Sequence, residues 1–582
     1  MDSSFRTTLV KDACIADITD DLTFAVESGA ANCTYQNFPA TSPSNSSLVF
    51  SVQLPSESIV MGRDVLLRSA LTFRVPCGGA LAPVPVGQPA FTYGVDSSLA
   101  AFPFSALVTT ASVQINNTNV SINLQDVLPQ LMCLNSREHL AYYNGMTPSL
   151  PDGDYAEFSD ALGATNNPVA GYANGGYDNR LAGRGGFPVS ITVLHQIFGA
   201  GTDASLISTN VGDTWVITVS AIVTEPLFLS PFIWGDPVKN AQGLVGVNNM
   251  AMTFNLDGQL KRIFSSSSPY ISGSLLAGSA ANPSLFTAVG LQTAIVPAPA
   301  VPTLLIKFLS TQASDIIKTK NVVPYTDFPR YITTSTVACP PFLNGAGAPV
   351  IVQQSSQNLQ LNQMPSKILV CLRKPMGLQT FADSSTFLTI TGVSVNLNNA
   401  SGLLSSASQA DLWRMSSRNG SNQTWSQFSG LGTKVGAYAG AANGIDLVGT
   451  GGSLLVLNPA YDLSLPDFIA PGSLGNYNLQ IIIQCCNQYS AAVTPEIVIV
   501  CVNDGIMTTM QGVSSTYTGI LSKQMVLDSK AMPAASSAVE SRMVGGALLN
   551  SYKFRPCKMG AAMSAGAMSG GAKSGKLARL MC

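Results

Sequence analysis

A short pattern occurs twice in this chain, about 280 residues apart, and constrains the fold more than any other feature. Residues 111–117 read ASVQINN and residues 393–399 read VSVNLNN, and six positions correspond at a constant spacing of 282 residues. A stretch typical of a helix follows each copy and contains Asp126 or Asp411. A repeat at this spacing indicates two similar domains, because solenoid repeats are about 20–50 residues long. Chance is the competing explanation, since Asn-Asn turns after alternating strands are common.

The chain carries few charges for its length. Of its 582 residues only 11% are charged, whereas about 25% is usual for soluble proteins. The net charge is -2, and the mean hydropathy is +0.26. A monomer with so little surface charge would associate readily. We therefore expect much of the surface to be buried against other subunits.

A membrane-spanning or secreted protein is the obvious alternative, and the sequence argues against both. The most apolar long run, residues 293–308, is interrupted by Pro297, Pro299 and Pro302. A spanning helix needs about 20 uninterrupted apolar residues. Charged residues also interrupt any apolar core of a signal peptide, and they are Asp2, Lys11, Asp12, Asp17, Asp20 and Asp21. We therefore expect the chain to be made and used on the cytosolic side.

The cysteines are predicted to be free thiols. There are eleven, scattered along the chain without a C-x-x-C pair. This odd, dispersed set is typical neither of a disulfide framework nor of a zinc site. We expect most of these thiols to be buried as small apolar side chains.

Strands of modest length, separated by Gly, Pro and Asn turns, dominate both halves. The first half has predicted strands at 48–56, 65–75, 111–117, 189–194, 214–223, 248–255 and 303–309, and one helix at 123–134. The second half has predicted strands at 349–353, 367–373, 386–397, 453–457, 477–486 and 496–502, and one helix at 405–416. This pattern predicts an all-β chain of two tandem jelly-roll β-sandwiches with short flanking helices and long interstrand loops.

Composition divides the chain into four parts. Residues 1–40 resemble an N-terminal arm, residues 41–318 a first jelly roll and residues 319–530 a second. Residues 531–582 form a predicted flexible, basic C-terminal tail, because Gly, Ala, Ser and Met dominate there and supply too little apolar bulk for a core.

Residues for catalysis are scarce. His139 and His195 are the only histidines, and neither has partners spaced for a catalytic triad or a two-histidine metal site. The segment from Gly570 to Leu577 approaches a phosphate-binding loop, but a leucine stands where Ser or Thr would hold magnesium. We therefore predict no enzyme, and no catalytic, cofactor-binding or metal-binding residues.

The tail carries two further patterns. Its cations are predicted to contact the genome or an inner membrane, and they are Lys553, Arg555, Lys558, Lys573, Lys576 and Arg579. The pattern Met-x-Gly-Gly-Ala occurs twice, and its fixed residues are Met543, Gly545, Gly546, Ala547, Met568, Gly570, Gly571 and Ala572. An exposed Gly-Gly pair can enter a narrow protease groove because no side chain obstructs it. The competing interpretation is a flexible linker.

Two tandem sandwiches with a matching strand, Asn-Asn turn and helix, low charge and long loops resemble the double jelly-roll major capsid proteins of adenovirus-like viruses, virophages and polinton-like viruses. This resemblance implies a subunit that self-assembles as trimeric, pseudo-hexagonal capsomers into an icosahedral viral shell enclosing the genome. The loops 140–190 and 429–452 would form outer towers and contacts between subunits. Cleavage after Gly546 or Gly571 would release the tail during maturation.

The same resemblance implies a place and partners. The chain would reside in the virion capsid, assembled in the host cytoplasm or nucleus and not secreted. Its partners would be copies of itself, penton proteins and minor capsid proteins, with a host receptor left unidentified.

Two other classes stay open at this point. One is a single-jelly-roll coat or fibre-type structural protein, and the other is a jelly-roll carbohydrate-binding protein. A lectin needs aromatic platforms, but the tryptophans are dispersed and are expected to anchor cores; they are Trp215, Trp234, Trp413 and Trp425.

Overall fold

The computed structural model describes residues 31–522 apart from short gaps and several longer ones. The longest gaps are 149–186, 233–242, 272–285, 290–300, 312–319, 342–349 and 436–444. Residues 1–30 and 523–582 also lie outside the described residues.

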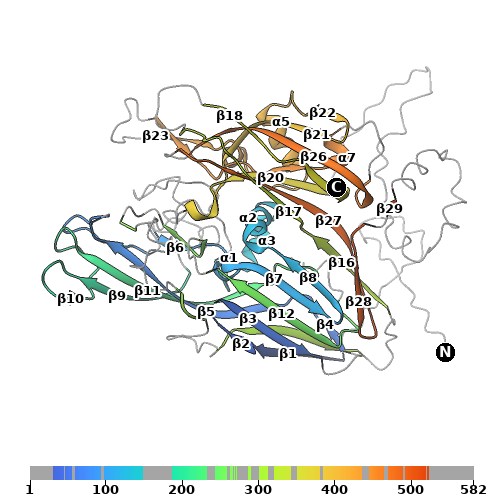
Figure 1. Ribbon diagram of the computed structural model, residues 1–582. Coiled ribbons are helices and arrows are strands. Elements are labelled where there is room, and N and C mark those ends of the chain that lie inside the picture. Colours follow the sequence, from blue (N-terminus) through green and yellow to red (C-terminus); the bar gives the residue numbers. More distant parts are fainter. Residues whose placement is uncertain are drawn as a thin grey trace, which may run out of the picture. The chain divides into compact units, whose positions relative to one another are not determined.

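The first half of the chain forms a β-sandwich of two antiparallel sheets (Figure 1). One sheet has the order β1 (Asn32–Pro39), β15 (Thr303–Ser310), β5 (Leu66–Gly78), β11 (Thr214–Pro226), β9 (Ser190–Gln196) and β10 (Thr202–Asp203), with β4 (Ile59–Met61) on β15 and β14 (Phe286–Val289) on β5. The other has the order β2 (Ser42–Pro43), β3 (Ser47–Gln53), β12 (Asn249–Leu256), β7 (Val108–Ile115) and β8 (Thr118–Ile122). A small pair, β6 (Ser97–Leu99) and β13 (Phe264–Ser266), lies apart from both.

The second half forms another sandwich. One sheet has the order β16 (Asn321–Asp327), β27 (Glu496–Met510), β20 (Lys367–Arg373) and β25 (Leu455–Leu457), with β17 (Arg330–Thr334) and β28 (Val513–Tyr517) also on β27. The other has the order β18 (Val352–Ser355), β26 (Ser473–Cys486), β21 (Thr389–Leu397) and β22 (Ala400–Leu403), with β19 (Leu359–Gln363) and β29 (Leu521–Ser522) also on β26. A hairpin of β23 (Leu431–Val435) and β24 (Ile445–Gly449) completes the set.

Alternation of side chains explains why these segments are strands. In β11 every second residue from Trp215 to Val223 is buried, and its neighbours are only half-buried. Successive side chains of a strand point to opposite faces, so this spacing places one row in the core. The predicted strand 214–223 is confirmed and extends to Pro226.

Short helices flank the sheets. They are α1 (Pro103–Leu107), α2 (Leu124–Leu134), α3 (Arg137–Ala141), the 3-10 turn η3 (Met376–Leu378), α5 (Gln409–Arg418), α6 (Trp425–Phe428) and α7 (Pro459–Asp462). α2 confirms the predicted helix 123–134 and continues through Pro129. α5 begins with a capping box, in which Ser408 and Asp411 each accept a hydrogen bond from the other's backbone N–H.

The repeated sequence pattern occupies equivalent places in the two sandwiches. Asn116 follows β7 and Asn398 follows β21, and both have positive φ, 51° and 54°. Each turn leads into a second strand, β8 or β22, before the helix begins. The expected order of strand, turn and helix therefore holds, with one additional short strand that the pattern did not predict.

The core of the first sandwich extends onto one face of the second sandwich. The first core contains Leu369 and Cys371 of β20 and Val498 and Val500 of β27, together with the first-half residues. A second cluster fills the interior of the second sandwich. Residues of one strand thus face both cores.

A buried ionic group connects the halves at the same place. Asp126 of α2 contacts Arg373 of β20 and Arg330 of β17, each at 2.6 Å. Arg373 also contacts Glu496 of β27, at 3.3 Å, and is only 4% exposed. The end of α2 is satisfied from the second half too, because Asn422 donates to the carbonyl oxygens of Cys133 and Leu134, both at 2.9 Å. The charged side chains and the last carbonyl groups of α2 therefore have bonding partners at this junction, which offsets the cost of removing them from water.

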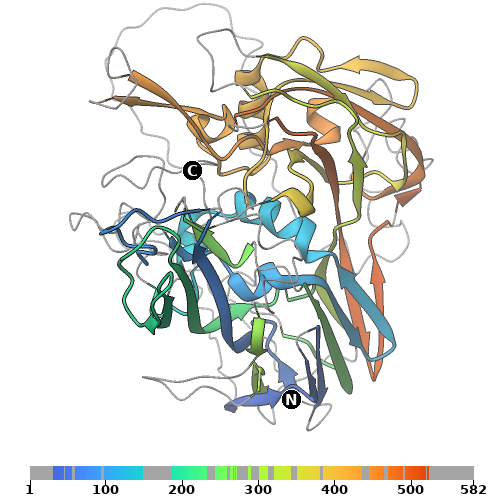
Figure 2. The ribbon, with the colours of Figure 1, turned by 60° about the vertical axis from the view of Figure 1, so that its left-hand side comes forward.

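β27 is a long strand that runs from the second sandwich toward the first (Figure 2). Its first part pairs with β17 and β20, and residues 503–510 pair with β16 and β28. The β27–β28 hairpin reaches the first sandwich, where the Ser514 N–H donates to the side-chain oxygen of Asn117 at 2.8 Å. Thr118 of β8 donates to the Ser514 carbonyl oxygen at 2.6 Å.

Several expectations need correction or stay open. The predicted loop 429–452 is wrong in part, because β23 and β24 form a hairpin within it. Trp425 is 42% exposed, so it is not the core anchor expected, whereas Trp215 is buried.

Residues 32–39 of the predicted arm pair with β15 as β1. Trp234 and most of the loop 140–190 lie outside the described residues. The divisions at residues 40, 318 and 530 stay predictions.

Candidate functional site

An edge of the first sheet carries the most unusual surface of the described chain. β9 pairs with only the first part of β11, and β10 pairs with the last two residues of β9. We call residues 190–213, which comprise β9, β10 and their loops, the flap. It lies at the left of Figure 1, where β9 and β10 are labelled.

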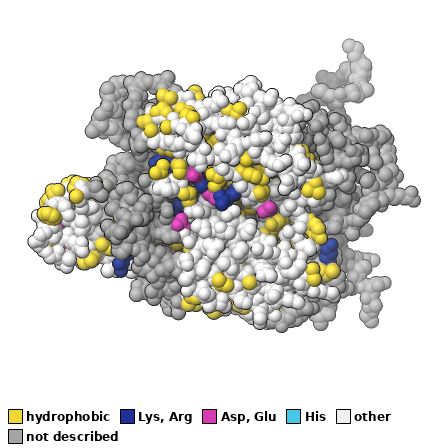
Figure 3. Space-filling model, in the orientation of Figure 1, with side chains coloured by type: hydrophobic (Ala, Val, Ile, Leu, Met, Phe, Trp, Pro, Cys, Tyr) yellow, Lys and Arg dark blue, Asp and Glu magenta, His cyan; other side chains and the backbone are white. Residues whose placement is uncertain are grey.

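Apolar side chains of the flap face solvent. Phe198 is 71% exposed and Val211 is 66% exposed. Ile191, Leu194 and Ile207 are 36–53% exposed. Figure 3 shows apolar side chains gathered on this part of the surface. Exposed apolar side chains that cluster in this way mark contact surfaces.

A neighbouring loop extends this surface. The Ser208 N–H donates to the Gln88 carbonyl oxygen at 3.0 Å, and the Gly87 N–H donates to the Ser208 carbonyl oxygen at 2.9 Å. Val86, beside these bonds, is 60% exposed. The loop therefore adds apolar area to the flap surface.

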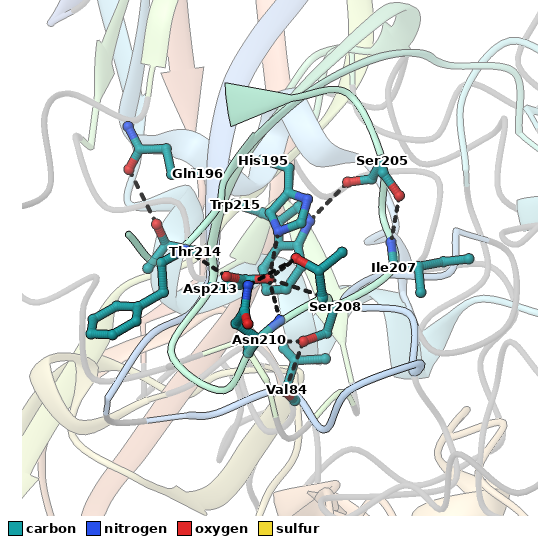
Figure 4. Close-up of polar contacts among 12 residues, drawn as sticks. Val84, His195, Gln196, Ser205, Ile207, Ser208, Asn210, Asp213, Thr214 and Trp215 are labelled. Atoms are coloured by element: carbon teal, nitrogen blue, oxygen red, sulfur yellow. Dashed lines mark hydrogen bonds and ion pairs between the residues drawn. The ribbon is translucent and has the colours of Figure 1, made fainter. Parts of the chain in front are cut away.

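The flap has no Lys, Arg or Glu, and its only acids are Asp203 and Asp213. Both acids are bound to the flap's own His195, as Figure 4 shows for Asp213. A single imidazole carries at most one positive charge, so the two carboxylates leave the flap with a net negative charge. Asp213 is buried and Asp203 is the flap's one partly exposed charge, so few charged groups would lose water if the apolar side chains were buried against another protein.

His195 is completely buried between the two carboxylates. Its Nδ1 lies 2.8 Å from an oxygen of Asp203, and its Nε2 lies 2.9 Å from an oxygen of Asp213. The ring stacks on Trp215, with centroids 4.4 Å apart and planes 10° apart. A carboxylate oxygen accepts hydrogen bonds, so both bonds form together only when both ring nitrogens carry hydrogens.

Asp213 ties the flap loops to this ring. Its carboxylate accepts hydrogen bonds from the backbone N–H groups of Phe198 at 2.7 Å, and of Thr209 and Asn210 at 2.9 Å each. Burial acts to raise the pKa of Asp213, but these backbone bonds outweigh it and hold that pKa well below its usual range. The carboxylate is therefore ionised, and it fixes the backbone beside Phe198 and Val211.

This arrangement suits a structural role and not catalysis. Both ring nitrogens of His195 already face carboxylates, so neither can take a proton from a nucleophile. The ring is also out of contact with solvent. Across the described ranges, no group of three His, Cys, Asp or Glu side chains comes together to hold a metal ion. Nor does any helix there have the length and apolar character to cross a membrane.

Comparisons with known proteins identify the family. The model of the Sputnik virophage major capsid protein 1st domain matches residues 3–308, more than half of the chain. The model of the major capsid protein V20 C-terminal domain matches residues 328–505. This chain belongs to the family of Sputnik-type virophage major capsid proteins. It is therefore a structural protein of the virion capsid and not an enzyme.

Individual relatives agree with this assignment. The capsid protein is 27% identical over 554 residues to the putative capsid protein V20 of Sputnik virophage, covering 92% of this chain and 84% of that protein. The cryo-electron microscopy structure of the Sputnik virophage is similar, with a TM-score of 0.71, 23% identity, and coverage of 93% of this chain and 98% of that chain. The crystal structure of the mavirus major capsid protein matches with a TM-score of 0.64, 14% identity, and coverage of 90% and 98%. The predicted fold of two tandem jelly rolls is confirmed.

The residues singled out from sequence are only partly within the described capsid protein. His139 lies in the middle of α3, and its Nδ1 is 2.9 Å from the Asn135 side-chain oxygen. Six of the eight described cysteines are buried. Every residue of the Met-x-Gly-Gly-Ala patterns and every tail cation lies outside the described residues.

The flap itself was not predicted as a site. Its one sequence signal is the spacing of His195, Asp203 and Asp213 around Gly-rich turns, and a lone histidine among strands is usually structural. The exposure of Phe198 and Val211 could not be predicted from the sequence either, because apolar residues in a β-rich chain are normally assigned to a core.

Proposed function

We propose that three copies of this chain form a pseudo-hexagonal capsomer, and that capsomers build an icosahedral shell that encloses the genome. The duplicated architecture carries this proposal. Each chain contributes two sandwiches with the same hairpin turn at Asn116 and Asn398. Three chains around a threefold axis thus supply six similar units, and closed symmetry of this kind is usual for assemblies of identical subunits.

The flap is the contact surface that we assign to this trimer. Its exposed apolar side chains include Phe198 and Val211, and Asp203 is its one partly exposed charged group. The His195 group holds the flap backbone in one arrangement, so little further ordering is needed when a neighbouring subunit binds. A rigid, mainly apolar surface with a single partly exposed charge fits a copy of the same weakly charged chain.

Sedimentation of the purified protein tests this proposal. The wild type is expected to sediment as a trimer, and the double variant Phe198→Ser, Val211→Ser is expected to sediment mainly as a monomer. Leu378→Ser is the matched control, because Leu378 is 63% exposed on η3, outside the flap. A monomeric wild type would overturn the trimer, and a trimeric flap variant would overturn the role of the flap.

The remaining partners are proposed from the resemblance. Penton and minor capsid proteins would complete the shell, and assembly would take place in the host cytoplasm or nucleus. The basic tail would contact the genome or an inner membrane, with cleavage after Gly546 or Gly571 releasing it. Mass spectrometry of purified particles tests the cleavage, because a chain intact to Cys582 would exclude it.

A further inference from the structure

Two buried thiols of the second sandwich lie next to each other although they are far apart in sequence. The sulfur atoms of Cys339 and Cys485 are 3.5 Å apart and are separated by 146 positions. Cys339 is 1% exposed and Cys485 is fully buried. A disulfide needs a sulfur separation of about 2.05 Å, so a small side-chain movement would bring the two sulfurs to bonding distance.

The backbone holds both residues in place from opposite sheets. Cys485 lies in β26, where it pairs with Val352 of β18 and Ile390 of β21. Cys339 lies beyond β17 and forms an isolated antiparallel bridge with Val493, which precedes β27, through two backbone hydrogen bonds of 2.7 and 3.0 Å. A bond between the two sulfurs would therefore join one sheet of the sandwich to the other.

The groups around the two sulfurs favour the thiolate form of Cys339. Gln354 donates to the Cys339 sulfur at 3.3 Å. The single hydrogen of the Cys485 thiol can be donated either to the Val352 carbonyl oxygen, 3.4 Å away, or to the Cys339 sulfur. When it points to Cys339, this hydrogen bond lowers the pKa of Cys339 despite burial, and Gln354 contributes to the lowering. The thiolate is the form that reacts with oxidants, so Cys339 is the first to react.

We propose that Cys339 and Cys485 form an intersheet disulfide when the capsid protein meets hydrogen peroxide in an oxidising environment. The Cys339 thiol reacts with one peroxide molecule to give a sulfenic acid and one water. The Cys485 thiol then attacks that sulfur and releases a second water as the disulfide forms. In total, two thiols are oxidised by two electrons and one peroxide is reduced to two waters.

This modification is independent of trimer formation and adds a property to the capsid subunit. Reducing conditions inside a cell keep such thiols free, and oxidising conditions outside permit disulfides. Burial excludes large oxidants from the pair, whereas peroxide is small and uncharged. The disulfide would close a loop of 146 positions and restrict the unfolded chain strongly.

Peptide mapping of the full-length chain tests the proposal. The reduced protein is treated with hydrogen peroxide, remaining thiols are blocked, and the digest is analysed without reduction. Because Cys486 adjoins Cys485, the variant Cys486→Ser is needed to assign the bond. A cross-linked peptide pair is expected in the wild type and in Cys486→Ser, and is expected to be absent from Cys339→Ser and Cys485→Ser.

Controls make either result decisive. Cys33 is exposed and reports that the peroxide has reacted. Cys501→Ser removes another buried thiol of the same core and is expected to keep the cross-link. Oxidation is also expected to raise the thermal midpoint by several degrees in the wild type, with no rise in Cys339→Ser. The proposal is overturned if wild-type Cys33 is oxidised without the cross-link, or if the cross-link persists in Cys485→Ser.

Discussion

Asn116 and Asn398 hold the same left-handed turn in the two jelly rolls, and each uses its side-chain oxygen in the same way. The Asn116 oxygen accepts a hydrogen bond from the backbone N–H of Asn248 at 2.8 Å, and the Asn398 oxygen accepts one from Asn478 at 2.9 Å. Their own N–H groups donate to Asn249 and Asn478, on the strands beside β7 and β21. An asparagine at positive φ that also bonds the next strand is therefore a shared feature of the duplication.

Replacing these asparagines should destabilise the two jelly rolls unequally. Asn116→Ala is expected to lower the free energy of unfolding by about 2 kcal/mol, through the strain of positive φ and the lost hydrogen bonds. Asn398→Ala should cost about 1 kcal/mol, because Asn398 is exposed and water replaces its partner. Urea unfolding measures both. Glycine variants separate the causes, since they relieve only the strain, and equal losses for Ala and Gly would contradict the strain argument.

Removing the Asp126 carboxylate should weaken the junction of the jelly rolls. Asp126→Ala leaves the buried Arg373 facing no carboxylate at that side, which is expected to cost about 3–5 kcal/mol. Arg330→Ala should cost about 1 kcal/mol or less, because Arg330 is 32% exposed. The double variant Asp126→Ala, Arg373→Met should lose less than the sum of its single variants, as measured by a double-mutant cycle. Additive losses would mean that the two side chains are not coupled.

Neutralising Asp213 should loosen the flap. Asp213→Asn keeps the size of the side chain but only one of its two acceptor oxygens, so it cannot accept from both the Phe198 N–H and the N–H groups of Thr209 and Asn210. Hydrogen exchange of residues 197–213 is expected to accelerate at least about tenfold. Asp203→Asn is the control, with a smaller effect because that side chain is 41% exposed. Unchanged exchange in Asp213→Asn would show that the loops are held by other contacts.

The acid dependence of the flap follows from the lowered pKa of Asp213. A carboxylate with a lowered folded-state pKa stabilises the fold above its unfolded value, near pH 4, and loses that contribution as the pH falls through the folded value. The protection of flap amides, that is the exchange rate of an unstructured peptide divided by the measured rate at the same pH, is therefore expected to stay constant down to about pH 4 in the wild type and to fall only below it. A loss of protection beginning between pH 6 and 7 would contradict this assignment.

Glu225 should give the first jelly roll the opposite pH dependence. Burial raises the pKa of this fully buried carboxyl from 4.5 to about 7, although Ser105, Phe104 and Thr147 donate hydrogen bonds to it. The folded state then holds a proton that the unfolded state releases, so stability should fall as the pH rises from about 4.5 to about 7. The loss is on the order of 3 kcal/mol. Glu225→Gln should remove this slope in urea unfolding series, and an unchanged slope would assign it to other groups.

Local patterns in the sequence account for most of the fold. Alternation around Trp215 predicted β11, and the apolar spacing on both sides of Asp126 predicted α2 within one residue. The Asn116 and Asn398 turns were predicted because the residues that make them are consecutive. Hairpin β23–β24 was missed, since Gly, Ala and Asn are typical of loops and its pairing depends on a partner strand.

The contacts between distant parts of the chain could not be predicted from local sequence patterns. Asp126 meets Arg373 across 247 positions, and Cys339 meets Cys485 across 146. No periodicity encodes which strands become neighbours at such separations. The flap group is closer in sequence, but the turn around Gly199 and Gly201 is needed to bring Asp203 to His195, and the pairing of β11 with β9 is needed to bring Asp213 there.

The path of β27 affects how each subunit would respond to force in a shell. This one strand is hydrogen-bonded within the second jelly roll and then, through the β28 hairpin, fastened to Asn117 and Thr118 of the first. A load that separates the two jelly rolls acts on this hairpin and also on the Asp126–Arg373 contact and on the apolar contact of β20 and β27 with the first core. These contacts would have to break together, whereas a simple linker would merely stretch. Each subunit would thus resist pressure from inside the particle as one stiff element.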